Sequence, residues 1–305
     1  MGEPTVAQLL QLATARPWRR SALDAASAVD LQEKLAAAVR EQRPIRFSVP
    51  FGGYKGWRQA SAPWPNWAEV FWLEHLRSYG QRLQAWHRPG VEISLSYCSG
   101  VLGWINNLPE EQQRTYVQAL EPLCRWASRP GVTLQLVDLK GRCGGAEGVL
   151  PVLQQRIEEL RPQWRKGLKD REDRLASAAR NLLPEGVEDL RGLSPEDWAA
   201  RVEEAALGCW ALESLEPRRA FNRGEGRIQL SHRRGRGPQL HLSSCHTSTL
   251  QPWVGSGYLE PAGEQGWRPR ILASATPQHW LTPPDSWQPE QPGLAQLGVL
   301  KAERR

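Results

Sequence analysis

The chain has 305 residues, of which 40% are hydrophobic and 24% are charged, and its formal net charge is +6 at pH 7. This composition is ordinary for a globular protein, and the length allows one large domain or a main domain with an appendage, so neither an enzyme nor a binding module is excluded. No run of about 18 apolar residues could span a bilayer and the start lacks a signal-peptide pattern, so a cytoplasmic protein with no membrane partner is expected.

The first half of the chain predicts an α/β core. Residues 1–43 are rich in Ala, Leu and Gln and predict an N-terminal helical layer of two helices. An alternating apolar run predicts the first strand at 44–50. The elements that follow are expected at 66–87 (helix), 91–97 (strand), 109–128 (helix) and 132–138 (strand). Because strands that alternate with long helices pair in parallel, 44–145 should form a mostly parallel sheet flanked by helices.

The second half predicts three further regions. Residues 146–216 are charged and helical in pattern, with a capped helix start at Ser194, and predict a helical insert of three or four helices lying over the site. Residues 217–276 predict a basic segment and short strands that complete the sheet. These strands are expected at 227–231, 239–243 and 270–275. Residues 277–305 are rich in proline and predict an irregular tail.

A candidate site lies in the loop after the first strand, which reads Phe-Gly-Gly-Tyr-Lys-Gly-Trp over 51–57. Ligands of open α/β sheets bind outside the carboxyl ends of the strands, so Lys55 is placed to pair with a phosphate or carboxylate, or to act as an amine if burial lowers its pKa. A solvated loop lysine is the alternative. Glu69 could be a base near this loop or a partner in a capping box with Asn66. The aromatic residues Tyr54 and Trp57 are candidates for lining a pocket.

Other candidate residues are polar groups near the ends of later strands. Between 218 and 236 the chain carries seven arginines and one carboxylate, which favours a phosphate site, although a solvated loop would have the same pattern. His232 beside this run either orients an anion or is merely exposed. Tyr97 ends the second predicted strand, and Asn106 lies near a proline in what could be only a turn.

Several common chemistries lack their motifs. No phosphate-binding Walker loop, dinucleotide-binding glycine fingerprint, histidine metal motif or nucleophile elbow is present, so no cofactor and no metal are expected. The five cysteines are widely spaced without a Cys-x-x-Cys pair, which predicts reduced thiols that are mostly buried.

Four stretches together resemble the isonitrile synthases of the pyoverdine/dityrosine biosynthesis family. They are Pro44 to Lys55, Pro65 to Glu69, Pro89 to Ile93 and Tyr97 to Gly100, with a fainter likeness at Arg227 to His232 and at Gln251 to Trp253. The family has an aspartate after the serine where this chain has Ser99-Gly100. It also has an aspartate where this chain has Asn66, and Val254 stands where its Trp-His pair is expected.

This resemblance implies a Rossmann-like α/β enzyme of secondary metabolism. Such an enzyme acts on the α-amino group of an amino acid, with the pentose phosphate ribulose 5-phosphate as co-substrate that supplies the isonitrile carbon. The residues assigned on this basis are Lys55, Glu69 and His232 for catalysis; Tyr54, Trp57, Tyr97, Ser99 and Asn106 for substrate binding; and Arg227, Arg233 and Arg234 for phosphate binding.

Two alternatives stay open at the level of the sequence. The basic segment, the helical insert and the 15 tryptophans would also suit an enzyme that uses aminoacyl-tRNA, similar to the cyclodipeptide synthases, because RNA binding relies on phosphate contacts and base stacking. A non-enzymatic interaction protein is the third possibility, and it would leave Lys55 without a role.

Overall fold

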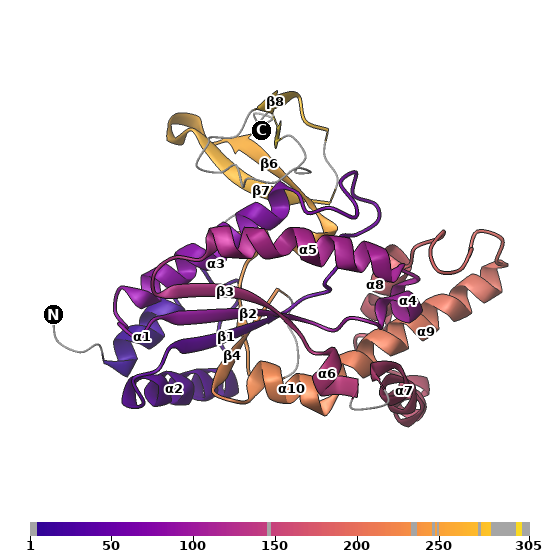
Figure 1. Ribbon diagram of the computed structural model, residues 1–305, viewed down its shortest axis with the longest axis horizontal. Helices are drawn as coiled ribbons and strands as arrows, with labels where there is room; N and C mark the ends of the chain where they lie inside the picture. Colours follow the sequence, from indigo (N-terminus) through magenta and orange to yellow (C-terminus); the bar gives the residue numbers. More distant parts are fainter. Residues whose placement is uncertain are drawn as a thin grey trace. The chain divides into compact units, whose positions relative to one another are not determined.

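The computed structural model of the chain describes residues 5–144, 148–232, 237–245, 248, 250–273, 276–281 and 297–300 (Figure 1). The chain divides into two units. The sheet unit comprises Met1–Ser96, Tyr116–Val137 and Asn222–Arg305, and the helical unit comprises Tyr97–Thr115 and Asp138–Phe221. Each unit is therefore built from segments that are distant in sequence.

The main sheet has five strands in the order β3-β2-β1-β4-β5. Their bounds are Ile45–Pro50 (β1), Val91–Tyr97 (β2), Val132–Asp138 (β3), Arg227–Ser231 (β4) and Leu240–His241 (β5). Strand β1 pairs in parallel with both β2 and β4, and β4 pairs in parallel with β5. The prediction of a mostly parallel α/β sheet flanked by helices is confirmed. The strand order reverses between β1 and β4, which is where sheets of this kind bind ligands.

The central strands are buried because helices cover them. Phe47 and Val49 of β1 and Ile93 and Leu95 of β2 are 0% exposed, as expected for a parallel sheet with helices on both faces. The helices of the sheet unit are α1 (Val6–Ala13), α2 (Ala25–Arg40), α3 (Trp67–Gln84) and most of α5 (Glu110–Ala127). Helix α2 packs against β1 and β4, so the predicted N-terminal helices form part of this layer.

The strands at the end of the chain differ from the prediction. Strands β6 (Ser256–Pro261), β7 (Trp267–Leu272), β8 (His279–Leu281) and β9 (Leu297–Val299) form a second sheet in the order β7-β6-β9-β8. The strand predicted at 270–275 therefore does not complete the main sheet, because β7 pairs antiparallel with β6 across a short turn. Strands β8 and β9 lie within the tail that was expected to be irregular, and β9 pairs with both β6 and β8.

The helical unit contains the predicted helical segment. Its helices are α4 (Leu102–Asn106), α6 (Lys140–Gly144), α7 (Val149–Arg165), α8 (Arg171–Asn181), α9 (Pro195–Ser214) and most of α10 (Glu216–Arg223). Helices α7 and α8 both pack on α9, whose first turn is capped by Ser194 through a bond from the Asp197 N–H at 3.1 Å. In the part of the chain that the structure describes, no helix combines the length and the apolar character needed to cross a membrane.

Candidate functional site

The loop 51–66 joins the carboxyl end of β1 to the start of α3. Asn66 caps that helix, because its Oδ1 accepts from the Ala68 N–H at 2.8 Å while its own N–H donates to Glu69 Oε2 at 2.8 Å. The predicted capping box is therefore confirmed. It fixes the Glu69 carboxylate in the first turn of α3, where the side chain is 0% exposed.

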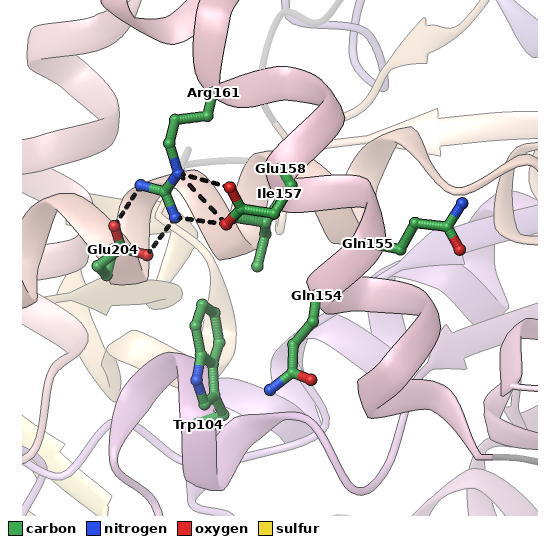
Figure 2. Close-up of a pocket in the computed structure, with 7 residues that line it drawn as sticks. All are labelled: Trp104, Gln154, Gln155, Ile157, Glu158, Arg161 and Glu204. Atoms are coloured by element: carbon green, nitrogen blue, oxygen red, sulfur yellow. Dashed lines mark hydrogen bonds and ion pairs between the residues drawn. The ribbon is translucent and has the colours of Figure 1, made fainter.

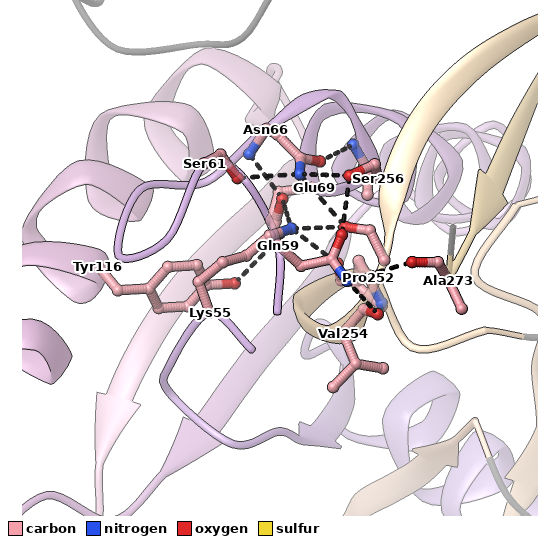
Figure 3. A network of polar contacts seen from close by, with 12 residues as sticks. Lys55, Gln59, Ser61, Asn66, Glu69, Tyr116, Pro252, Val254, Ser256 and Ala273 are labelled. Carbon is pink, nitrogen blue, oxygen red and sulfur yellow. Dashed lines mark hydrogen bonds and ion pairs between the residues drawn. The ribbon is translucent and has the colours of Figure 1, made fainter. Parts of the chain in front are cut away.

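Lys55 reaches that carboxylate from the loop (Figure 3). Its Nζ donates to Glu69 Oε1 at 2.8 Å and Oε2 at 2.9 Å, and the Lys55 side chain is also 0% exposed. Two backbone carbonyls, of Pro252 at 3.0 Å and Gly255 at 2.8 Å, accept from the same nitrogen. The Tyr116 hydroxyl donates to Glu69 Oε1 at 3.0 Å. The structure thus brings together the two residues predicted to be catalytic and adds three partners.

Burial dominates the electrostatics of this network. It lowers the pKa of Lys55 and raises the pKa of Glu69, and the attraction between the two groups opposes both shifts. Burial and the neighbouring carboxylate also raise the pKa of Tyr116, so this phenol is a donor. All four hydrogen-bond partners of Lys55 Nζ are oxygens that accept. The protonated amine, which has three N–H donors and no acceptor, suits these partners. The network is therefore an ammonium paired with a carboxylate, and no donor of the ammonium is left for a ligand.

The network holds the loop against the segment that precedes β6. Of the two carbonyl partners of Lys55, Pro252 is the first residue of the short helix η2 (Pro252–Val254) and Gly255 directly follows it. The Gly56 N–H donates to the Trp253 carbonyl at 2.6 Å, and Gln59 Nε2 donates to the Val254 carbonyl at 3.0 Å. The backbone around Trp253 is therefore fixed against the loop.

Trp253 belongs to an aromatic cluster around His232. Its ring centroid lies 5.8 Å from that of His232 and 5.7 Å from that of Trp72, and Phe51 lies 5.8 Å from Trp253. Phe51 directly follows β1 and His232 directly follows β4. The cluster therefore occupies the carboxyl ends of the two strands between which the strand order reverses.

The imidazole of His232 is buried and incompletely bonded. Its Nδ1 lies 3.5 Å from the Ser244 hydroxyl, whereas Nε2 has no hydrogen-bond partner among the described residues. The residue is only 7% exposed. Burial lowers the pKa of His232 from 6.5 to about 4, so the ring is neutral at pH 7. A buried polar nitrogen without a partner is costly, and a catalytic role is one explanation for such a group.

No protein-family model matches the chain, and no curated protein matches it. Among solved structures, the crystal structure of PvcA from Pseudomonas aeruginosa matches it with a TM-score of 0.63, covering 88% of this chain and 92% of PvcA at 17% sequence identity. The chain shares the fold of PvcA. At this identity the similarity concerns the fold, and it agrees with the Rossmann-like architecture expected from the resemblance.

The other residues predicted in the sheet unit are placed as follows. Tyr54 is buried, and its ring lies over Gly52, where an added Cβ would come within 2.4 Å of Cε1. Trp57 is half-buried, with the Arg58 guanidinium 4.9 Å from its ring centroid. Both belong to the loop that Lys55 anchors, and they stay candidates for binding substrate.

Arg227 is the first residue of β4 and therefore lies at the end of the strand opposite His232. Its guanidinium is paired with Glu225 at 2.5 Å and lies 3.7 Å from Glu92. The structure thus does not bring this predicted phosphate ligand to the edge that carries Lys55 and His232. Arg233 and Arg234 lie outside the described residues.

The remaining predicted residues belong to the helical unit. Ser99 donates from its hydroxyl to Asp138 Oδ2 at 2.5 Å and from its N–H to Oδ1 at 3.0 Å. Tyr97 and Asn106 are buried, and each accepts a backbone hydrogen bond at its carbonyl. Sequence reasoning missed Asp138, although it ends a predicted strand. It also missed Tyr116, which lies within a helix and has no local signal.

A cavity of about 380 Å³ lies elsewhere in the helical unit (Figure 2). It is lined by Trp104, Gln154, Gln155, Ile157, Glu158, Arg161 and Glu204. Arg161 donates to both Glu158 and Glu204, so its charge is already neutralised. None of the predicted site residues lines this cavity. Within the described residues, no cluster of three or more His, Cys, Asp or Glu side chains could hold a metal ion.

Proposed function

We propose that the chain is an isonitrile-synthase-like enzyme of secondary metabolism, which acts on the α-amino group of an amino acid with ribulose 5-phosphate as co-substrate. The observation that carries this proposal is the unpartnered Nε2 of His232, at the carboxyl end of β4 and against Trp253 of the segment that Lys55 bonds. The PvcA-like fold and the motif positions of these three residues support it.

In this proposal His232 is the group that contacts the reacting atoms. The substrate amine attacks the ketone carbon of the sugar phosphate, and negative charge develops on the ketone oxygen. A neutral imidazole can donate a hydrogen bond to that oxygen, or accept a proton from the nitrogen, because its ring is uncharged at pH 7.

Lys55 and Glu69 act in this proposal as positioning residues. The Lys55 ammonium is hydrogen-bonded to four oxygens, and its side chain is 0% exposed. It therefore acts on the substrate indirectly, by fixing the segment that contains Pro252 and Gly255. That segment carries Trp253, whose ring packs against His232. In this proposal Lys55 therefore does not itself pair with a phosphate or carboxylate of the substrate, as the sequence had allowed.

The test is an incubation of the full chain with amino acids and ribulose 5-phosphate, followed by mass spectrometry. We expect a product in which the amine nitrogen has become an isonitrile. His232→Phe keeps an aromatic ring in the cluster and should lower kcat by about 100-fold or more. The matched control is His279→Phe, at an exposed histidine of β8, which should leave kcat unchanged.

Two outcomes would overturn the proposal. One is a folded protein that forms no isonitrile from any amino acid. The other is a cyclic dipeptide formed from aminoacyl-tRNA without the sugar phosphate, which would instead support the tRNA-dependent alternative. Full activity in a folded His232→Phe variant would remove the role of His232.

A further inference from the structure

Two cysteines that are 45 positions apart in sequence meet in the helical unit. Cys98 follows the last residue of β2, and Cys143 lies in α6, directly after β3. The Leu139 N–H donates to the Tyr97 carbonyl at 2.8 Å, and the Cys143 N–H donates to the Leu139 carbonyl at 2.9 Å. The segment after β3 is thereby held beside the end of β2, with the two thiols hydrogen-bonded to each other.

The surrounding structure keeps these thiols together. Asp138 accepts from both the hydroxyl and the N–H of Ser99, which joins the residue after Cys98 to the end of β3. Asp138 also accepts from the Lys140 N–H at 2.9 Å, at the start of α6. Both cysteines are free thiols, and each is 3% exposed. Ser99 on this edge is half-buried and Asp138 is exposed, so the pair lies directly beneath a solvent-facing edge.

The charges around the pair distinguish one sulfur from the other. The hydrogen bond from Cys98 lowers the pKa of Cys143 to about 7, with Arg218 contributing in the same direction, while burial and Asp138 oppose the shift. The same hydrogen bond and burial raise the pKa of Cys98. Helix α6 itself carries Lys140 and Arg142, and the Arg142 guanidinium stacks on Phe221 at 5.1 Å. A thiolate on Cys143 next to a thiol on Cys98 is the arrangement found in reactive dithiols.

We propose that Cys98 and Cys143 form a peroxide-reactive dithiol site that closes reversibly to a disulfide. The Cys143 thiolate attacks one oxygen of hydrogen peroxide, the O–O bond breaks, and hydroxide leaves to give a sulfenic acid. The Cys98 thiol then attacks that sulfur, the S–O bond breaks, and water leaves. The hydroxide takes up the proton that Cys143 lost on ionising, so in total two thiols become one disulfide and one peroxide is reduced to two waters. A dithiol reductant reverses the reaction.

The test treats the full chain with hydrogen peroxide and maps its peptides without reduction. We expect a peptide pair linked through Cys98 and Cys143, two hydrogens lighter than the thiols, which disappears on treatment with dithiothreitol. In Cys98→Ser the resolving thiol is absent, so Cys143 should accumulate as a sulfenic acid that dimedone traps. The matched control is Cys124→Ser, at a cysteine that is buried in α5, and it should still form the linkage.

The rate of the first step should follow the ionisation of Cys143. Its oxidation rate is expected to rise with pH around a midpoint of about 7. Linkage through other cysteines, or oxidation of Cys143 that leaves Cys98 a free thiol in the wild-type chain, would overturn the proposal. The measurement needs no turnover of an amino acid, so its outcome is independent of the proposed function.

Discussion

At the scale of single residues, the Lys55–Glu69 pair is buried on both sides, with both side chains 0% exposed. Removing one partner of such a pair leaves an uncompensated charge in the interior. Lys55→Met, which has similar length and no charge, should therefore lower the free energy of unfolding by about 3–5 kcal/mol in urea titrations. The double variant Lys55→Met/Glu69→Gln should recover part of this loss, because no buried charge remains.

A solvent-exposed ion pair provides the control. Arg125 and Glu121 form an i,i+4 pair at 3.0 Å on α5, with side chains 66% and 61% exposed. Because water screens this pair, Arg125→Ala should change the free energy of unfolding by at most about 0.5 kcal/mol. If Lys55→Met lowers the free energy of unfolding by an equally small amount, the Lys55–Glu69 pair is not buried and fully hydrogen-bonded as described.

The lowered pKa of His232 predicts that the free energy of unfolding depends on pH. Its pKa is lowered from 6.5 to about 4 in the folded protein by burial, so the unfolded chain takes up this proton first as pH falls. The stability contributed by the neutral ring is complete above pH 6.5 and is lost as pH falls toward 4, by about 3 kcal/mol in all. The measurement is the free energy of unfolding of wild type and His232→Phe at several pH values.

The difference between those two proteins isolates His232 from the carboxylates, which titrate in both. We expect the difference in free energy of unfolding to be constant above pH 6.5. At lower pH the wild type should lose stability relative to His232→Phe. A difference that does not vary between pH 7 and pH 4 would show that the imidazole is solvated.

At the scale of elements, β6 approaches the first turn of α3 through a glycine. A Cβ added at Gly257 would lie 2.4 Å from the backbone carbonyl carbon of Trp67, so the strand and the helix would have to separate. Gly257→Ala should therefore lower the free energy of unfolding by about 1–3 kcal/mol in thermal or urea unfolding. Gly141→Ala is the control, because nothing lies within 4 Å of that position in α6 and alanine favours a helix. Equal stabilities for the two variants would argue against the close contact.

The elements that the sequence predicted correctly are those with local signals. The strands expected at 91–97 and 132–138 match β2 and β3, because alternating residues bounded by Pro-Gly or a turn are recognisable within a short window. Strands β8 and β9 have three residues each and depend on pairing with each other and with the distant β6. No window of sequence contains that information.

The same distinction applies to the candidate site. The capping box relates Asn66 to a residue three positions away, so it was predictable. The other partners of the buried pair are Tyr116, 47 positions from Glu69, and two backbone carbonyls about 200 positions from Lys55. A carbonyl has no residue type that could signal it. The burial of His232 likewise results from Trp72 and Trp253, which only the fold brings together.

At the scale of the whole molecule, the sheet unit is discontinuous. Its third segment, Asn222–Arg305, supplies β4, which pairs with β1 near the centre of the main sheet, and β5 beyond it. Ile228 and Leu230 of β4 are 2% and 1% exposed. The same segment provides both carbonyls that bond Lys55. This C-terminal segment therefore contributes to the core of the sheet unit.

A fragment of residues 1–221 should consequently fail to fold cooperatively. It would leave one edge of β1 unpaired, uncover the apolar side chains that β4 buries, and leave the Lys55 ammonium with two of its four acceptors. We expect no sigmoidal urea transition and a weak near-ultraviolet circular dichroism spectrum from its tryptophans. A chain that ends at residue 300 keeps every described element and should unfold like the full chain. If fragment 1–221 instead shows the cooperative transition of the full chain, the placement of β4 inside the sheet is wrong.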